Sequence, residues 1–150
     1  MPDVLIATDA PTVSDEVRSV LDPGTTVREV RRGREVVPEV RKEKPGLAVL
    51  DLQIGKMGGM ATCLELRLEE GAGRLPHVQV LMLLDRRADV FLARRAKADG
   101  WIVKPLDPMR LARAVRAVLA GGRYEDESYK PPTIEPPEPQ VPVGSPGPNG

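Results

Sequence analysis

The sequence has one cysteine and one histidine, and aromatic residues make up only 3% of its 150 positions. Because Cys63 has no second cysteine to pair with, an intrachain disulfide is excluded and nothing suggests secretion. The lone His77 follows a proline and has no neighbouring ligand pattern, which argues against a catalytic or metal-binding role. The core must therefore consist of Val, Leu, Ile and Ala side chains. Cys63 lies among leucines in a helical pattern, which is typical of a small core residue.

Long apolar runs are also lacking. No stretch approaches the roughly 18 apolar residues that a membrane-spanning helix needs, so direct membrane insertion is not expected. The run Val4–Ala7 is far too short for the apolar core of a signal peptide. The sequence therefore predicts a cytoplasmic protein.

Neither sign of charge is in excess, since Lys and Arg number 22 and Asp and Glu also number 22. No overall field therefore attracts nucleic acid. The charges are unevenly distributed, because residues 124–150 hold one base and five acids, which leaves about +4 on the preceding body. A local basic cluster is interrupted by glutamates and lacks aromatic residues, which favours a solvated face over a nucleic-acid site, although an acidic partner could equally dock there. Its members are Arg28, Arg31, Arg32 and Arg34.

Five short apolar runs alternate with helical patterns in residues 1–122, which we interpret as one domain. Near-continuous apolar strands between helices are typical of a parallel sheet covered on both faces. Right-handed crossovers then favour a doubly wound, flavodoxin-like α/β fold with five strands in the order 2-1-3-4-5. The predicted strands are Val4–Ala7, Thr25–Val30, Leu47–Asp51, Val78–Leu84 and Trp101–Val103. The predicted helices cover about Val13–Leu21, residues 35–43 with Pro38 near the start, Met60–Gly71, Asp89–Ala98 and Met109–Leu119.

Residues 123–150 differ in composition from the domain before them, with eight prolines, several acids and scattered glycine and serine. So few apolar side chains cannot form a core, and we expect an extended, polyproline-like tail. At about 3.1 Å per residue it would reach on the order of 80 Å, far enough to lie along a partner protein. The residues expected to contact that partner are Tyr124, Tyr129, Pro131, Pro132, Ile134, Pro136 and Pro137.

Chemistry-bearing side chains follow several of the predicted strands. Asp9, Asp51 and Lys104 stand at or just after strand ends, and these ends share one edge of a doubly wound sheet. Two carboxylates and a loop carbonyl suit a hard divalent cation such as Mg²⁺, while a lysine can bind a phosphoryl oxygen. Asp51 could then act as an acyl-phosphate nucleophile. Taken singly, each residue also has a plainer interpretation as a helix cap or part of a turn.

Four segments together resemble the receiver domain of two-component response regulators, and the resemblance covers residues 3–121. It implies that Asp51 is the phospho-acceptor, that Asp9 is a direct metal ligand and that Lys104 binds phosphate. It also implies a cis bond between Lys104 and Pro105. The segments that carry the resemblance are Val4–Asp9, Leu47–Leu52, Met57–Gly59 and Trp101–Pro105.

The sequence departs from the family pattern at the switch positions. Thr8 replaces one of two acids at the end of the first strand, which removes a charge and should weaken Mg²⁺ binding. Leu84 stands where the family has a Ser or Thr hydroxyl that bonds the phosphoryl group, and Asp85 then places a negative charge near an incoming phosphate. Trp101, at the usual aromatic switch position, would have no hydroxyl to follow, so simple packing is favoured. Gly55 also replaces a proline of the pattern.

These departures predict a degenerate receiver that serves as a protein-interaction module and not as an enzyme. The leading hypothesis is a stable accessory subunit of a larger assembly, anchored by residues 123–150. The composition is similar to that of actinobacterial receiver-like proteins, one group of which resembles an accessory subunit of respiratory complex I. That likeness implies the cytoplasmic arm of complex I, at the inner face of the cell membrane, as the partner. The alternative is a stand-alone response regulator that takes phosphate from a histidine kinase onto Asp51. A DNA-binding regulator would need a helix-turn-helix, which the pattern does not predict.

Overall fold

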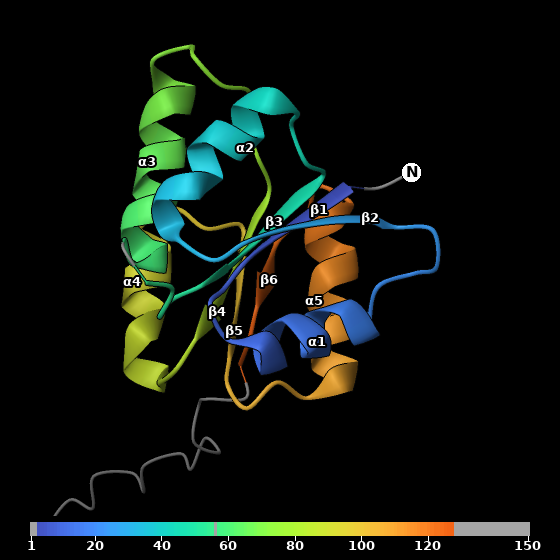
Figure 1. The fold of residues 1–150 in the computed structure, drawn as a ribbon. Helices are drawn as coiled ribbons and strands as arrows, with labels where there is room; N and C mark the ends of the chain where they lie inside the picture. The colour runs from blue at the N-terminus through green and yellow to red at the C-terminus, as the bar shows by residue number, and fades with distance from the viewer. Residues whose placement is uncertain (1–2, 56, 128–150) are drawn as a thin grey trace, which may run out of the picture.

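The structure is a computed structural model that describes residues 3–55 and 57–127. A parallel sheet forms the centre of the molecule, and its strands lie in the order β2-β1-β3-β4-β5-β6 (Figure 1). This confirms the predicted flavodoxin-like order 2-1-3-4-5 and adds a short strand at one edge. The strands are β1 (Asp3–Ala7), β2 (Thr26–Val30), β3 (Leu47–Asp51), β4 (Val80–Leu84), β5 (Gly100–Val103) and β6 (Tyr124–Glu125).

Helices cover both faces of the sheet, because the central strands are apolar on both sides. Alternate residues of β1 illustrate this: Leu5 belongs to the buried cluster under α2, α3 and α4, and Ile6 to the cluster under α1 and α5 (Figure 1). The helices are α1 (Pro11–Ser19), α2 (Val36–Lys42), α3 (Gly59–Gly71), α4 (Val90–Arg95) and α5 (Pro108–Leu119). Two 3₁₀ turns, η1 (Gly33–Glu35) and η2 (Arg87–Asp89), lead into α2 and α4. No helix in these described ranges is long and apolar enough to cross a bilayer.

Several element boundaries differ from the predicted ones for identifiable local reasons. The fourth strand starts at Val80, not Val78, because side chains of α3 take the backbone groups of Val78: Arg67 donates to its carbonyl at 2.8 Å and Glu70 accepts from its N–H at 3.2 Å. The fourth helix ends at Arg95, not Ala98, because Lys97 adopts a left-handed backbone with φ of 60°. The first helix ends at Ser19, with Val20 as its cap, two residues before the predicted Leu21.

Two predictions about individual residues can be compared with the structure directly. Pro38 is the third residue of α2, within the first turn, where a missing N–H leaves no helical hydrogen bond unmade. Cys63 is fully buried and its thiol donates to the Ala96 carbonyl, as expected of a core residue. Burial raises the pKa of the Cys63 thiol to about 12, so it stays protonated at neutral pH.

The strand β6 lies in a stretch that the sequence analysis assigned to the extended tail. Tyr124 pairs with Gly100 of β5, where a Cβ would lie 2.9 Å from the Tyr124 carbonyl oxygen, so only glycine lets the two backbones approach this closely. Asp126 follows and is 1% exposed, with its Oδ2 accepting from the Val103 N–H at 3.0 Å and lying 3.4 Å from Arg110 Nη1. The chain is therefore built into the domain as far as Asp126. The other predicted partner-contacting residues, Tyr129, Pro131, Pro132, Ile134, Pro136 and Pro137, lie outside the described residues.

We predict that truncation after Gly122 destabilises the domain, whereas truncation after Glu127 does not. The shorter chain loses β6 and the Asp126 carboxylate, which leaves the buried Val103 N–H without its acceptor, a loss of about 1–3 kcal/mol. Urea unfolding of the two truncated chains and the full chain measures the difference. Equal free energies of unfolding for the two truncations would show that residues 123–127 add nothing to the stability of the fold.

Candidate functional site

Asp51 lies at the carboxyl end of β3 and is only 2% exposed. Its Oδ2 accepts a hydrogen bond from the Thr8 hydroxyl at 2.7 Å. Its Oδ1 accepts from Lys104 Nζ at 2.9 Å and from the Gln53 N–H at 3.2 Å. A carboxylate is retained in such a buried position only when its charge is compensated and its oxygens are bonded, and here both conditions hold.

Lys104 follows β5, and its Nζ contacts two carboxylates at once: Asp51 at 2.9 Å and Asp85 Oδ1 at 3.1 Å. The Lys104–Pro105 peptide bond is cis, as the resemblance implied. Burial of the ammonium opposes its charge, but the hydrogen bonds and negative charges of Asp51 and Asp85 outweigh that effect and hold the pKa of Lys104 above its ordinary value. The amine is therefore a full cation at neutral pH.

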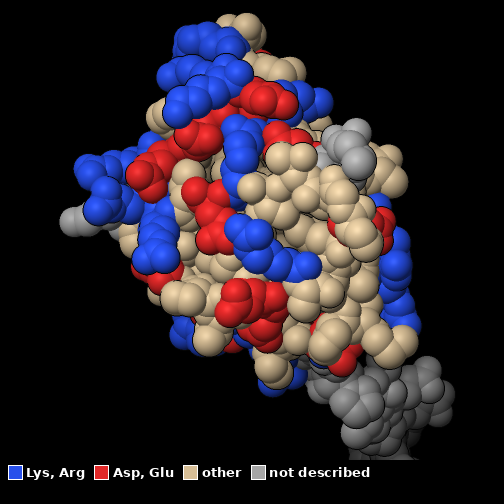
Figure 2. Space-filling view, turned by 45° about the vertical axis from the view of Figure 1, so that its right-hand side comes forward, with Lys and Arg blue, Asp and Glu red and all other residues tan. Residues whose placement is uncertain are grey.

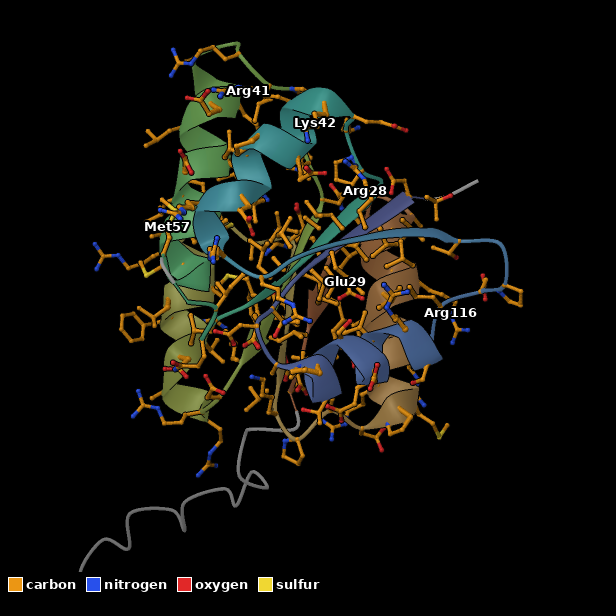
Figure 3. The ribbon with its side chains drawn as sticks, in the orientation of Figure 1. Arg28, Glu29, Arg41, Lys42, Met57 and Arg116 are labelled. Atoms are coloured by element: carbon orange, nitrogen blue, oxygen red, sulfur yellow. The ribbon has the colours of Figure 1, made fainter. Side chains whose placement is uncertain are left out.

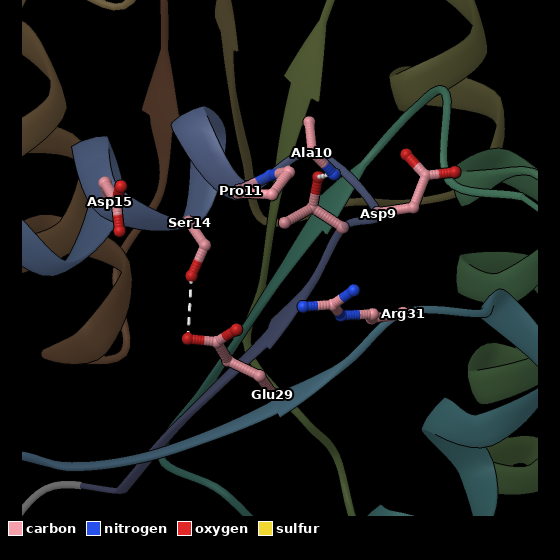
Figure 4. A pocket seen from close by; sticks show the side chains of 8 residues that line it. Asp9, Ala10, Pro11, Ser14, Asp15, Glu29 and Arg31 are labelled. Atoms are coloured by element: carbon pink, nitrogen blue, oxygen red, sulfur yellow. Dashed lines mark hydrogen bonds between the residues drawn. The ribbon is translucent and has the colours of Figure 1, made fainter.

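The end of β1 contributes Thr8 and Asp9, which behave differently. Thr8 is buried; its hydroxyl donates to Asp51 and accepts from the Ala10 N–H at 3.1 Å. Asp9 is exposed, and its Oδ2 accepts from the Gly55 N–H at 3.1 Å in the loop after β3. A pocket of about 190 Å³ lies between this end of β1 and α1, with Asp9 and Arg31 in its lining (Figure 4). Its lining residues are Thr8, Asp9, Ala10, Pro11, Ser14, Asp15, Glu29 and Arg31.

The donors near Asp51 fit a hard cation only in part. Across the ranges that the structure describes, no group of three or more His, Cys, Asp or Glu side chains is placed to hold a metal ion. Asp9 and Asp51 supply two carboxylates, and Thr8 adds a neutral hydroxyl where a third charge would strengthen binding. Mg²⁺ is commonly bound by one or two carboxylates together with a phosphate of the substrate, and this set fits that kind of site.

The end of β4 places a hydrocarbon side chain and a further acid near Asp51 and Lys104. Leu84 is fully buried in the cluster that also contains Val90 and Trp101, so no hydroxyl faces Asp51 from the end of β4. Asp85 follows it; its Oδ2 is buried and, among the described residues, has no hydrogen-bond partner. Leaving such an atom unpaired disfavours the conformation by about 1–3 kcal/mol.

Trp101 is fully buried on β5 under α4. Its Nε1 likewise has no hydrogen-bond partner within the described ranges, and the Arg94 guanidinium of α4 lies 5.5 Å from the ring centroid. These contacts are those of a packing residue, which is the interpretation that the sequence favoured.

Arg28, one member of the basic cluster, is paired with acidic groups of the domain. Arg28 is directed toward α2 and the N-terminal strand (Figure 3), where it pairs with Asp3 at 2.8 Å and Glu39 at 3.3 Å and donates to the Glu43 carbonyl at 2.7 Å. On the face shown in Figure 2, basic and acidic side chains are interspersed. The acid partners of Arg28 argue against a phosphate-backbone contact by this residue.

Comparisons with known proteins agree with the doubly wound sheet. The family model described as response regulator receiver domain matches residues 4–116. The chain belongs to the response regulator receiver domain family.

Similar proteins come from several bacteria. The DNA-binding response regulator MtrA of Mycolicibacterium smegmatis is 32% identical over 125 residues, which are 83% of this chain and 52% of MtrA. Protein PilH of Pseudomonas aeruginosa is 27% identical over 81% of this chain and 100% of its own length. The signal receiver domain of a histidine kinase from Syntrophus aciditrophicus superposes with a TM-score of 0.70 at 30% identity, covering 81% of this chain and 92% of that one. The chain thus spans about half the length of MtrA and all of PilH.

The sequence predicts that Asp9, Asp51 and Lys104 lie at one edge of the sheet. In the structure they lie at or just after the carboxyl ends of β1, β3 and β5. Two contacts were missed: the Thr8 hydroxyl as a donor to Asp51, and the ion pair between Asp85 and Lys104. The second could have been found, because β4 and β5 are neighbours and Leu84 pairs with Val103, which places the next residues side by side. The first depends on a side-chain rotamer, which no pattern of residue types specifies.

The raised pKa of Lys104 predicts a specific loss of stability at high pH. A group whose pKa is raised on folding stabilises the fold below its ordinary pKa and loses that contribution as the pH rises through the folded value. We expect Lys104→Gln to unfold about 1–3 kcal/mol more easily at pH 7, and this gap to close above about pH 10.4. Urea unfolding of the wild type and of Lys104→Gln from pH 7 to about pH 11.5 measures this difference in unfolding free energy. Lys42→Gln, on the exposed side of α2, is the control, and a pH-independent gap for Lys104→Gln would contradict the assignment.

Proposed function

We propose that this receiver domain accepts a phosphoryl group on Asp51 from a histidine kinase of a two-component pathway. The observation that carries the proposal is the 2.9 Å contact between Lys104 Nζ and Asp51 Oδ1 at the shared edge of the sheet. A carboxylate that fixed donors hold in position is a competent nucleophile toward phosphorus. The family membership and the histidine-kinase receiver domain among the similar structures support the same pathway.

The transfer itself needs little from the protein beyond positioning. A carboxylate oxygen of Asp51 forms a bond to phosphorus as the bond between phosphorus and the kinase histidine breaks, and the electron pair stays on the imidazole nitrogen. Lys104 is placed to neutralise part of the added negative charge, since its ammonium already contacts Asp51. Asp9 and Asp51 would hold Mg²⁺, which when bound supplies further charge neutralisation at the phosphoryl oxygens. The neutral Thr8 makes this a weak metal site.

We predict that acetyl phosphate with Mg²⁺ adds one phosphoryl group, about 80 Da, to the full chain. Intact mass spectrometry measures the product. Asp51→Asn removes the nucleophile and should abolish the adduct. Asp22→Asn, the same change at an exposed aspartate outside the candidate site, should leave the adduct in place. The proposal fails if the wild-type chain gives no adduct or if Asp51→Asn still gives one.

A second function, a receiver that acts as a fixed protein-interaction module without phosphorylation, is favoured by one observation. Leu84 is buried hydrocarbon where a hydroxyl would bond the phosphoryl group, so the ordinary response to phosphate has no donor at this position. In this case the protein is a stable subunit of a larger assembly, held in part by the proline-rich residues after Glu127. Respiratory complex I stays a prediction of the resemblance, because none of the relatives named above carries such a name.

Gentle purification of the tagged protein from its own cells tests this second function. We expect a co-purifying protein with the full chain and weaker retention with a chain ending at Glu127, which keeps β6 and the fold but removes the proline-rich segment. Two free monomers would eliminate the fixed-subunit function. Equal retention of one partner by both chains would place the contact on the folded domain.

A further inference from the structure

Asp85 is held at the candidate site by an unusual set of contacts. It is the first residue after β4, and its Oδ1 lies 3.1 Å from Lys104 Nζ. Its other oxygen, Oδ2, is buried without a hydrogen-bond partner among the described residues, although the side chain as a whole is 29% exposed. The carboxylate therefore stays in place through Lys104 on one side, while its second oxygen would gain hydrogen bonds to water if it moved outward.

Lys104 is in turn shared, because the same ammonium contacts Asp51 at 2.9 Å. One cation thus compensates two carboxylates whose oxygens both touch it. A phosphoryl group on Asp51 would add more negative charge at this point, together with strong acceptor oxygens that bind an ammonium well. Asp85 would then face a like charge across a shared cation, an arrangement that drives the two anions apart.

We propose that Asp85 and the phosphoryl group compete for the ammonium of Lys104, so that loading of Asp51 expels Asp85 and moves the connection between β4 and α4 outward. This inference rests on the proposed phospho-acceptor function of Asp51. The domain could then respond to phosphorylation without a hydroxyl at position 84. The movement comes from repulsion between anions and not from attraction toward the phosphoryl group.

The contacts beyond Asp85 carry such a movement to α4. Asp89 accepts from the Arg86 N–H at 3.0 Å and is buried, which ties the connection to the start of α4. At the other end of α4, Arg94 lies over the Trp101 ring at 5.5 Å. Because Trp101 is the only tryptophan of the chain, its emission reports the environment between α4 and β5 without labelling.

The test compares the full wild-type chain with Asp85→Asn, which keeps the shape of the side chain and removes its charge. Asp22→Asn, an exposed change of the same kind, is the matched control, and Asp85→Ala is a second variant in case the amide disturbs the fold. Each protein is incubated with acetyl phosphate and Mg²⁺. The Asp51 carboxylate then bonds to phosphorus and acetate leaves. Intact mass gives the loaded fraction, and Trp101 emission at equal loading gives the movement.

We expect Asp85→Asn to reach half-loading at about a tenfold lower acetyl phosphate concentration, because one like charge no longer opposes the phosphoryl group. We also expect its Trp101 emission to change less than half as much on loading as that of the wild type, because nothing is expelled. Asp22→Asn should match the wild type in both measurements.

The outcomes separate this inference from the proposed function. If the wild type loads and Asp85→Asn matches it in both measurements, the competition is overturned while the phospho-acceptor function stands. If only the Asp85 variants load, Asp85 does oppose the phosphoryl group, and the wild-type chain is not a phospho-acceptor. If no variant loads, removing the rival carboxylate has not opened the site, and both proposals are overturned.

Discussion

The structure at this edge of the sheet depends on bonding the oxygens of one buried carboxylate, Asp51. Asp51 lies at the end of a strand that is buried on both faces, where an uncompensated charge would be strongly unfavourable. The Thr8 hydroxyl, the Gln53 N–H and the Lys104 ammonium together supply that compensation, and they come from three different segments. Only the parallel order that places β1 and β5 on the two sides of β3 and β4 brings those segments together. The fold and the charge therefore support each other.

Thr8 affects the balance of charge at this edge of the sheet. An acid there would add a second negative charge beside Asp51, which a bound cation would have to offset. A hydroxyl instead donates to Asp51 and is itself fixed by the Ala10 N–H. Both oxygens of Asp51 are thus bonded by protein groups alone. Asp85, a further acid near Asp51, contacts the same Lys104 ammonium.

Most of the fold and the main members of the site could be predicted from the sequence, and the failures have local causes. Continuous apolar runs such as Leu47–Asp51 and Val80–Leu84 identify buried parallel strands because nothing polar interrupts them. The start of β4 was misplaced because side chains of α3, the helix just before it, replace its ladder partners at Val78, and residue patterns do not specify such side-chain contacts. The strand β6 was missed because two residues carry no periodicity, and its place depends on Gly100 leaving room for a neighbouring backbone. Contacts such as Thr8 to Asp51 depend on rotamers and lie beyond residue patterns.

The short strand β6 has a consequence for how copies of this protein behave at high concentration. An uncovered outer strand offers a row of free N–H and C=O groups to any other sheet, which invites stacking into fibres. Here the apolar β5 would otherwise be that outer strand. Tyr124 and Glu125 of β6 pair with its first two residues, and the Asp126 carboxylate accepts from the N–H of Val103, its last residue. The opposite margin is β2, whose Arg28 and Glu29 place charges along it. Within residues 3–55 and 57–127, neither margin presents a long, flat, apolar strand, which disfavours edge-to-edge joining of sheets.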